Sequence, residues 1–592
     1  MMDLVPGAVD RPVKTTRYLG SYSLDIKLPV DGLKFRSNLG LDARTVQDYE
    51  FWSAKTSNRG MGTSYAKNAV DKYTMFTLEN MLFYDKTFND KHTLGVTLLQ
   101  SIQEDKRESV NVAMENLPAD NLKYYDLGSG LVTNTIGSAM VKWNMASFMG
   151  RINYNYLGRY LLTVSARYDG SSRLADGHKW VLFPSAALAW RINEESFMSS
   201  TSGWLDNLKL RLGFGKTGNS AVDPYQTKGT LSLIRYPFDN GGTPTIGYAP
   251  NAMANSLLTW ETTDQWNLGI DFGVLRGRIN GTIDLYMQNT HDLLLKRQLP
   301  VVSGFPDVLS NVGKTRNKGI EVSINSMNIN SKDFQWTTDL MLSSNKEEIV
   351  ELYNGKNDDI GSKWFIGQPV NVHYDYRKVG IWQNTESDLA EMAKFAANGT
   401  EFAPGDIKIQ DVNGDYKITD ADKQILGNPR PKLIASMVNT FNYKGFDLSV
   451  FLYASFGAML YNDIYAVEHC GRNGGVKVDY WTPNNPTNAY PRPSIDEERP
   501  IYITSTYYEK ADFLRVKTMT LGYTLPKTLT NKFLVEKLRV YFTAQNPFIF
   551  TNYTGIDPEA AKVNSAGNPE TNGSGFGTPS VSSWIFGINL TL

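Results

Sequence analysis

Cysteine, histidine and unbalanced charge are scarce in this chain, and each scarcity excludes a class of protein. Among 592 residues there is one cysteine, Cys470, so neither an intrachain disulfide nor a multi-cysteine zinc site can form. The five histidines are scattered without an HExxH or other paired spacing, and in the absence of a recognisable catalytic set we expect no enzyme. The 60 Lys and Arg residues balance 61 Asp and Glu residues, which argues against a nucleic-acid-binding protein.

Long apolar runs are also missing. No stretch approaches the roughly 20 consecutive apolar residues of a membrane helix. Residues 1–6 have neither the basic start nor the apolar core of a signal peptide. Glycine and aromatic residues are abundant instead, with 49 Gly, 32 Tyr and 12 Trp, and this composition favours all-β structure.

Alternation of apolar and polar residues with a period of two recurs along the chain. In residues 266–273 one face carries Trp, Leu, Ile and Phe, and the other carries Asn, Gly, Asp and Gly. Because successive side chains of a strand point to opposite faces, this pattern predicts strands with one apolar face. Three further segments follow the same scheme: 160–169, 208–214 and 538–545.

Two folds contain such strands, a soluble antiparallel sheet with one wet face and a transmembrane antiparallel β-barrel. Three features favour the barrel. The segments are about 10 residues or longer, which spans a bilayer when the strand is tilted. Aromatic residues cap the apolar faces, as Tyr160 and Tyr168 do. Short connections alternate with long ones, as periplasmic turns alternate with long extracellular loops. The long connections lie at about 97–141, 219–262, 353–431 and 462–512.

Several of these strands carry sequence that resembles the SusC/RagA family of TonB-dependent outer-membrane transporters. The sequence YNYLGRYLLT at 154–163 is followed by RYDGSSR at 167–173, and RLGFGKTGN stands at 211–219. Further matches lie at 260–263, 311–313, 317–321, 513–517, 521–523, 540–541 and 545–546. The matches follow the family's order along nearly the whole chain, so the chain is identified as a member of this family.

The resemblance implies import of bulky nutrients, oligosaccharides or oligopeptides, across the outer membrane of Bacteroidota. It also implies a barrel embedded in outer-membrane lipid, a SusD-like surface lipoprotein over the barrel mouth, and energy from TonB–ExbB–ExbD delivered through a plug. No segment matches the plug, so we expect this chain alone not to support coupled transport. The alternative is a passive outer-membrane pore or binding barrel that is not coupled to TonB, and the sequence upstream of Met1 would separate the two.

The alternating segments number roughly seventeen. Their centres lie near 22, 40, 78, 95, 150, 164, 187, 211, 269, 285, 321, 340, 437, 450, 518, 541 and 586. An outer-membrane transporter of this kind has about 22 strands and a plugged lumen. The short connection at 28–32 is expected to be periplasmic, so the first segment runs inward. Even-numbered strands run inward in a 22-stranded barrel, and counting seventeen strands back from the last one begins at strand 6. The direction of the first segment therefore agrees with strands 6–22. We therefore assign residues 1–592 to the barrel and expect the plug, the signal peptide and the first strands upstream.

One predicted loop carries regularly spaced oxygen donors. In the segment 411–422, positions 1, 3, 5, 7, 9 and 12 resemble the ligands of a calcium loop, and such hard donors suit Ca²⁺ rather than a transition metal. The donors would be Asp411, Asn413, Asp415, the carbonyl of Lys417, Thr419 and Asp422. The glycine at position 4 and the aspartate at position 12 depart from the pattern, so a turn capped by its own side chains is the alternative. No other cofactor is expected.

Aromatic residues gather in the predicted outer loops. Their faces stack on sugar rings and pack against peptides, so we expect them to line a substrate path. These residues are Trp364, Tyr374, Tyr376, Trp382, Tyr480, Trp481 and Tyr490. The alternative is that they pack the loops against one another or against a lid protein.

Single-cysteine variants in native membranes, with Cys470 replaced by serine, test the alternation in residues 266–273. Positions expected to face lipid should resist a water-soluble maleimide: Trp266, Leu268, Ile270 and Phe272. Positions expected to face the lumen should react: Asn267 and Asp271. Equal labelling of the two sets would contradict the barrel.

Overall fold

The computed structural model describes residues 5–60, 62–238, 245–462, 477–493, 500–559 and 580–591, so His469 and Cys470 lie outside the described part. The chain divides into two compact units. The first comprises Met1–Trp190, Leu212–Trp266 and Thr290–Gly313, and the second comprises Arg191–Arg211, Asn267–Asn289 and Lys314–Leu592. Within the described ranges, no helix is long and apolar enough to cross a membrane.

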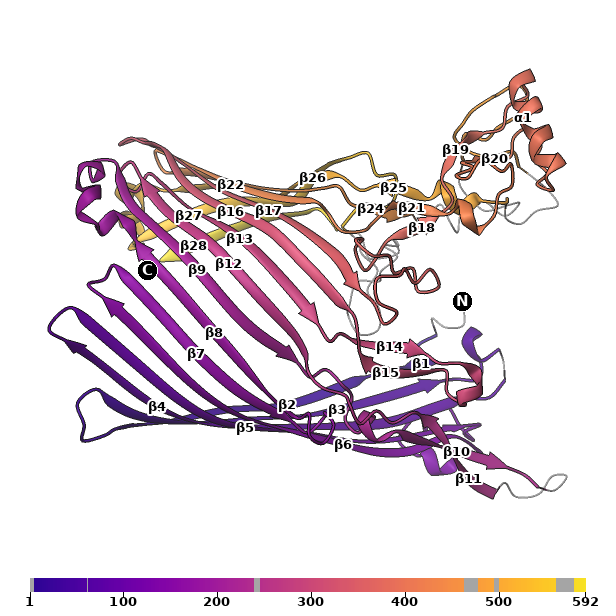
Figure 1. Ribbon diagram of the computed structural model, residues 1–592, viewed down its shortest axis with the longest axis horizontal. Coiled ribbons are helices and arrows are strands. Elements are labelled where there is room, and N and C mark those ends of the chain that lie inside the picture. Colours follow the sequence, from indigo (N-terminus) through magenta and orange to yellow (C-terminus); the bar gives the residue numbers. More distant parts are fainter. Residues whose placement is uncertain are drawn as a thin grey trace. The chain divides into compact units, whose positions relative to one another are not determined.

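The first unit is an antiparallel sheet of long strands (Figure 1). The short β1 (Val9–Asp10) pairs with the end of β3. The remaining strands pair in chain order: β2 (Val13–Lys27), β3 (Leu33–Trp52), β4 (Tyr65–Phe88), β5 (His92–Glu115), β6 (Val132–Tyr156), β7 (Tyr160–Ser171) and β8 (Trp180–Arg191). The register places apolar residues opposite one another, as Tyr22, Leu39 and Leu78 are on three neighbouring strands, so this part of one face is apolar.

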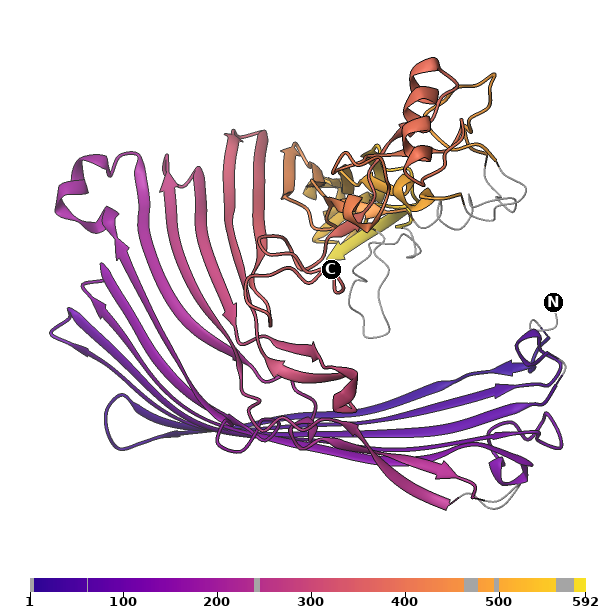
Figure 2. The same cartoon turned by 45° about the vertical axis from the view of Figure 1, so that its right-hand side comes forward.

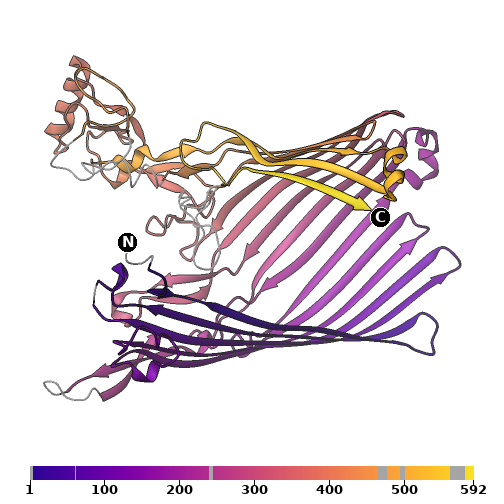
Figure 3. The ribbon, with the colours of Figure 1, turned by 180° about the vertical axis from the view of Figure 1, so that it is seen from behind.

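The second unit continues in the same antiparallel manner (Figure 3). Its ladder runs through β16 (Lys314–Asn330), β17 (Phe334–Glu351), β22 (Leu433–Tyr443), β23 (Phe446–Phe456), β26 (Phe513–Thr524), β27 (Lys537–Thr551) and β28 (Ser583–Thr591). Three strands contribute residues to both units: β9 (Leu205–Asn219), β12 (Glu261–Val274) and β13 (Ile279–His291).

Small elements fill the long connections. In the first unit two hairpins form, β10 (Thr230–Tyr236) with β11 (Thr245–Ala252), and β14 (Leu294–Gln298) with β15 (Asp307–Asn311). In the second unit the elements are β18 (His373–Asp375), β19 (Lys378–Ile381), α1 (Glu386–Ala397), β20 (Ile407–Ile409), β21 (Gln424–Gly427), β24 (Met459–Tyr461), β25 (Tyr508–Lys510) and α3 (Lys527–Thr530).

Each segment predicted from alternation lies inside a long strand of the described chain, so the all-β prediction is confirmed. The strands run further than predicted. Strand β5 ends at Glu115 and β6 begins at Val132, so the connection expected at 97–141 is confined to 116–131. The charged run at 104–108 breaks the apolar pattern, but its backbone continues the ladder because ladder hydrogen bonds do not depend on side-chain type.

Strand β7 shows the alternation most clearly. Exposure alternates residue by residue from Tyr160 to Tyr168, and the exposed face carries apolar and aromatic side chains. Leu162 and Val164 on this face are 40% and 44% exposed. Soluble monomers rarely expose a continuous apolar face, so this face is suited to lipid.

Aromatic stacks close this apolar face at both ends. Tyr160 stacks on Tyr156 and on Trp190, with ring centroids 6.3 and 6.4 Å apart. At the other end of β7, Tyr168 stacks on Trp180 with ring centroids 4.9 Å apart. The residues between the two stacks extend about 27 Å along the strand, which is the scale of the roughly 25 Å apolar band of an outer-membrane barrel.

The opposite side of β12 carries ion pairs within the second unit. The Arg211 guanidinium lies 2.8 Å from Asp271 Oδ1 and 3.0 Å from Asp284 Oδ1. The neighbours of Asp271 on the other side of the strand, Leu268 and Ile270, are 41% and 38% exposed. The predicted separation of apolar and polar side chains onto two faces of β12 is therefore confirmed.

Replacing Phe51 by alanine tests an apolar core that joins the ends of two strands, β3 and β4, to a loop. Phe51 is fully buried against Ala66, Leu117 and Tyr124. Because the cavity cannot fully collapse, Phe51→Ala is expected to lower the free energy of unfolding by about 3–5 kcal/mol in urea titrations of the detergent-solubilised chain. The control Phe88→Ala, at a residue 40% exposed on a strand end, is expected to cost less than about 1 kcal/mol. Equal losses would contradict this core.

Candidate functional site

The connection between β17 and β22 folds into a small domain together with two later segments. We define the loop domain as residues 373–427, 477–493 and 500–510, all within the second unit. Two small sheets, β18–β21 and β19–β20, and helix α1 build it, and Figures 1 and 2 show these elements gathered together. Alternation of period two does not predict α1. The helix begins after Thr385, whose hydroxyl accepts the N–H of Asp388.

Two apolar cores hold the loop domain together. The first core comprises Ile381, Ile407, Ile409, Trp481, Ile503 and Tyr507. The second comprises Trp382, Met392 and Phe395, with Phe402, Tyr416 and Ile418 packed against them. Because successive residues of an extended chain point to opposite sides, Ile381 and Trp382 anchor the end of β19 in both cores.

Two of the aromatic residues predicted to line a substrate path belong to these cores. Trp382 is 0% exposed and Trp481 is 6% exposed. Neither ring offers a free face for stacking, so the alternative role, packing the loops against one another, holds for both. The indole N–H of Trp481 donates to Gln383 Oε1 at 2.9 Å, which fixes the ring further.

The other predicted aromatic residues do not gather on one surface. Tyr374 packs its ring on Phe365 at 4.8 Å, and Tyr376 packs on Tyr502 at 4.9 Å. Trp364 and Tyr490 are half-buried, whereas Tyr480 is 46% exposed. A substrate-facing role therefore stays a prediction, and Tyr480 is the member of this set with the most accessible ring.

The loop domain contains a pocket of about 300 Å³ that the sequence does not reveal. Phe402 and Tyr502 supply aromatic walls, and Glu401, Asp406 and Arg492 supply charged groups. Arg492 Nε lies 2.9 Å from Asp406 Oδ1 although the two residues are 86 positions apart, so no spacing in the sequence relates them. Aromatic faces beside a carboxylate and a guanidinium suit a sugar or peptide with ring faces, hydroxyls or amides.

A glycine makes this arrangement possible. Gly405 has a φ of +93°, and a Cβ there would lie 2.5 Å from the Trp481 ring and 2.7 Å from Arg492 Cβ. A side chain at position 405 would therefore push both residues away. The backbone N–H of Arg492 donates to the Gly405 carbonyl at 2.8 Å, which needs this close approach.

Burial shifts titratable groups in the loop domain. Burial and the neighbouring Asp420 raise the pKa of Tyr376 to about 12, and the Tyr376 hydroxyl lies 3.2 Å from Asp420 Oδ1. Burial lowers the pKa of Lys378 to about 8, and its Nζ donates to the Ala489 carbonyl at 2.6 Å. Burial also lowers the pKa of His373. Near neutral pH, Tyr376 and His373 are thus uncharged hydrogen-bonding groups rather than ions.

The loop at 411–422 satisfies its own oxygen atoms. The carboxylate of Asp411 accepts the N–H groups of Gly414 and Tyr416, both at 2.8 Å. Asp422 is 0% exposed and accepts the N–H groups of Val412 and Thr419 at 2.9 and 2.8 Å. These bonds match the self-capped turn.

The side chains of Asn413 and Asp415, two further predicted calcium ligands, also form hydrogen bonds within the loop. Asp415 Oδ1 accepts the N–H of Lys417, and its other oxygen accepts the side-chain amide of Asn413. Across the ranges that the structure describes, no three His, Cys, Asp or Glu residues gather as a metal-holding group. The calcium site therefore stays a prediction. Its ligands would be these carboxylates together with amide and backbone oxygens.

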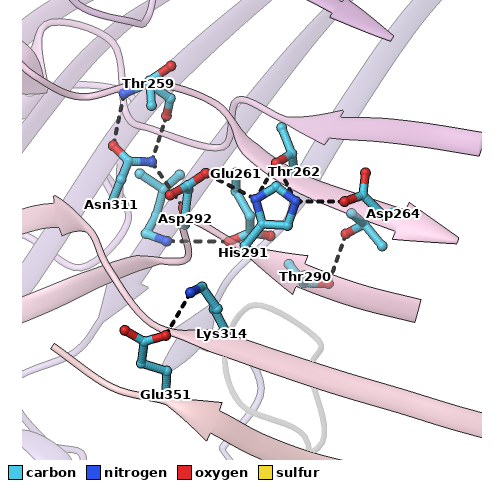
Figure 4. Close-up of polar contacts among 12 residues, drawn as sticks. Thr259, Glu261, Thr262, Asp264, Thr290, His291, Asp292, Asn311, Lys314 and Glu351 are labelled. Carbon is cyan, nitrogen blue, oxygen red and sulfur yellow. Dashed lines mark hydrogen bonds and ion pairs between the residues drawn. The ribbon is translucent and has the colours of Figure 1, made fainter. Parts of the chain in front are cut away.

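A second polar network lies in the first unit, on two of the family-like motifs (Figure 4). The His291 ring lies 2.9 Å from Thr262 Oγ1 and 3.0 Å from Asp264 Oδ2. Asn311 accepts the N–H of Thr259 at 2.8 Å and donates to its carbonyl at 2.9 Å. Thr262 is 6% exposed, so its hydroxyl is closed to a substrate. The network holds the ends of β12 and β13 and the following loop in place.

Comparison with known proteins places these features in context. The family model for TonB-dependent receptor-like β-barrels matches residues 6–546. TonB-dependent receptor P3 of Formosa agariphila is 32% identical over 581 residues, which cover 95% of this chain and 56% of that protein. TonB-dependent receptor SusC of Bacteroides thetaiotaomicron is 35% identical over 434 residues, which cover 70% of this chain and 41% of SusC.

A solved structure shares the fold. The structure of the RagAB peptide transporter matches with a TM-score of 0.82 at 22% identity, covering 98% of this chain and 62% of that chain. The chain spans about half the length of the curated relatives it matches. The likeness to RagAB shows the fold alone.

Replacing Asp422 by alanine tests how the loop at 411–422 is held. The N–H groups of Val412 and Thr419 lose the buried carboxylate that accepts them, at a cost of about 1–3 kcal/mol in total. Hydrogen exchange of 411–422 is expected to accelerate, whereas Glu386→Ala, at an exposed residue of the same loop domain, should leave it unchanged. Slow exchange that appears only with added CaCl₂ would support the calcium site over the self-capped turn.

Proposed function

Because the chain belongs to the family of TonB-dependent receptor β-barrels, we propose that it forms the barrel of an outer-membrane importer for oligosaccharides or oligopeptides. The resemblance to the SusC/RagA proteins is confirmed, with 35% identity to SusC. The observation that carries the proposal is the exposed apolar face of β7, closed at both ends by aromatic stacks. Ion pairs on the other face of β12 suit a polar lumen.

Two partner systems follow from this proposal. A SusD-like surface lipoprotein covers the mouth, and TonB–ExbB–ExbD supplies energy through a plug. The support comes from relatives, since one is named SusC and the RagAB structure is that of a peptide transporter. TonB-dependent receptors are transporters, and proteins of this family reside in the outer membrane.

The loop domain is the part that we assign to substrate contact. Its pocket combines Phe402 and Tyr502 with the Asp406–Arg492 ion pair. Rings bind the apolar faces of sugars or side chains, and charged groups bind hydroxyls or peptide amides. Tyr480 supplies a further exposed ring.

Uptake by Bacteroidota cells tests the function. Cells carry this chain alone, or joined to the amino-terminal portion of SusC, and receive labelled oligosaccharides or oligopeptides. We expect uptake from the joined protein that disappears when tonB is deleted, and no uptake from the chain alone. Uptake that persists without TonB would support a passive pore and overturn the proposal.

Replacing Arg492 by glutamine in the joined protein tests the loop pocket. The substitution removes a charged hydrogen-bonding group, so uptake at low substrate concentration is expected to fall about tenfold or more. Arg377→Gln is the matched control, because Arg377 belongs to the same loop domain but bonds Gln424 outside the pocket. Equal loss in both variants, at equal surface expression, would contradict a substrate role for the pocket.

A further inference from the structure

A second cavity lies in the first unit, at the end of β6–β8 that carries the longer connections. Its volume is about 580 Å³. The end of β7 is followed by residues 172–179, whereas the turn at the other end, between β6 and β7, is residues 157–159. Short turns are periplasmic and long connections extracellular in outer-membrane barrels, so this cavity belongs to the outer side.

The cavity is positively charged. Three lysines line it, Lys142, Lys179 and Lys228, against a single acidic residue, Asp176. Three positive charges and one negative charge leave an excess of two positive charges among the lining residues, and of one when Glu104, the ion-pair partner of Lys142, is counted. Such an excess attracts an anion, because a lysine is a compact charge with three donors.

The three lysines are available to a ligand. Lys179 lies 2.5 Å from Asp176, whose side chain is 86% exposed, and Lys142 lies 2.9 Å from Glu104. Surface ion pairs of this kind contribute little and exchange readily for a stronger partner. Lys228 forms no salt bridge with a residue of the described chain, and the pKa of Asp176 is lowered by Lys179 together with the positive charge of Lys228.

The walls of the cavity are preformed. The backbone N–H of Lys142 donates to the Tyr225 hydroxyl at 3.3 Å, and that of Asn144 donates to Ser172 Oγ at 2.8 Å. The Arg173 guanidinium lies 3.9 Å from the centre of the Trp143 ring. These contacts join β6 to both neighbouring loops, so the lysines need little rearrangement to act together.

The position of the cavity relative to the apolar face identifies the source of the anion. Lys179 directly precedes Trp180, which stacks on Tyr168 at 4.9 Å and lies 6.3 Å from Phe148. Lys142 has the same parity on β6 as the exposed Phe148, so both lie on the lipid-suited face. Aromatic rings of this kind lie at the level of the headgroups, and long lysine side chains reach back toward that level.

We propose that this cavity binds the phosphorylated headgroup of a lipid in the outer leaflet of the membrane. Clustered lysines next to a membrane surface recognise anionic headgroups. A bare phosphate would leave most of 580 Å³ unfilled, so the headgroup is a phosphate carried on a sugar or cyclitol ring. The proposal rests on the membrane position of the barrel and not on its transport activity.

Lipid binding to the purified full chain in detergent micelles tests the proposal. The probes are phosphatidylinositol 4-phosphate and phosphatidylinositol, which differ by one phosphate monoester, and bound lipid is measured by native mass spectrometry. We expect phosphatidylinositol 4-phosphate to bind at least about tenfold more strongly than phosphatidylinositol. The triple variant Lys142→Gln, Lys179→Gln, Lys228→Gln should lose this difference.

A control variant distinguishes binding at this cavity from a general effect of lysine charge on lipid binding. The matched variant Lys356→Gln, Lys363→Gln, Lys477→Gln removes three exposed lysines from other connections and should keep the preference. Both variants must retain the strand circular dichroism of the parent. Equal lipid binding by the parent and the first variant would overturn the site. Displacement of the lipid by equimolar free inositol 1,4-bisphosphate would show a soluble phosphate ligand and overturn the membrane assignment.

Discussion

The pairing of backbone N–H and C=O groups is the constraint on which the rest of this structure depends. Inside a bilayer no water replaces a missing partner, so a strand that crosses it must pair along its whole length. Strands β4 and β5 pair from end to end, from Tyr65 opposite Glu115 to Phe88 opposite His92. The same ladder continues through the charged segment at 104–108, because it uses backbone groups alone.

Once the ladder satisfies the backbone, the two faces of each strand are free to differ. On β7 the exposed face is apolar and ends in aromatic stacks, and on β12 the opposite side holds Asp271 against Arg211. Residues of the family-like motifs help to stabilise these strands. Arg515, 3% exposed, binds Asp557 at 2.6 Å, and such a buried pair is costly to break because the remaining charge would be left unpaired.

The outer loops are stabilised in a different way, because water can hydrogen-bond their backbone groups and no strand pairing sets their conformation. The loop domain holds itself by two small apolar cores that share one short strand through Ile381 and Trp382. Its charged groups are therefore placed by packing, as Arg492 is placed against Gly405. This freedom allows such loops to carry specificity while the strands below them keep one architecture.

The sequence by itself determined the strands, because alternation depends only on which side of a strand each residue occupies, and the predicted centres all fall in strands. It also determined the family, through motifs such as those at 154–163 and 211–219. Tertiary structure alone decided the sites. It buried Trp382 and Trp481, which composition marks as substrate-binding candidates, and joined Asp406 to Arg492. It also gathered Lys142, Lys179 and Lys228 from three segments. Pattern is local, whereas a site is built by residues that only folding brings within a few ångströms.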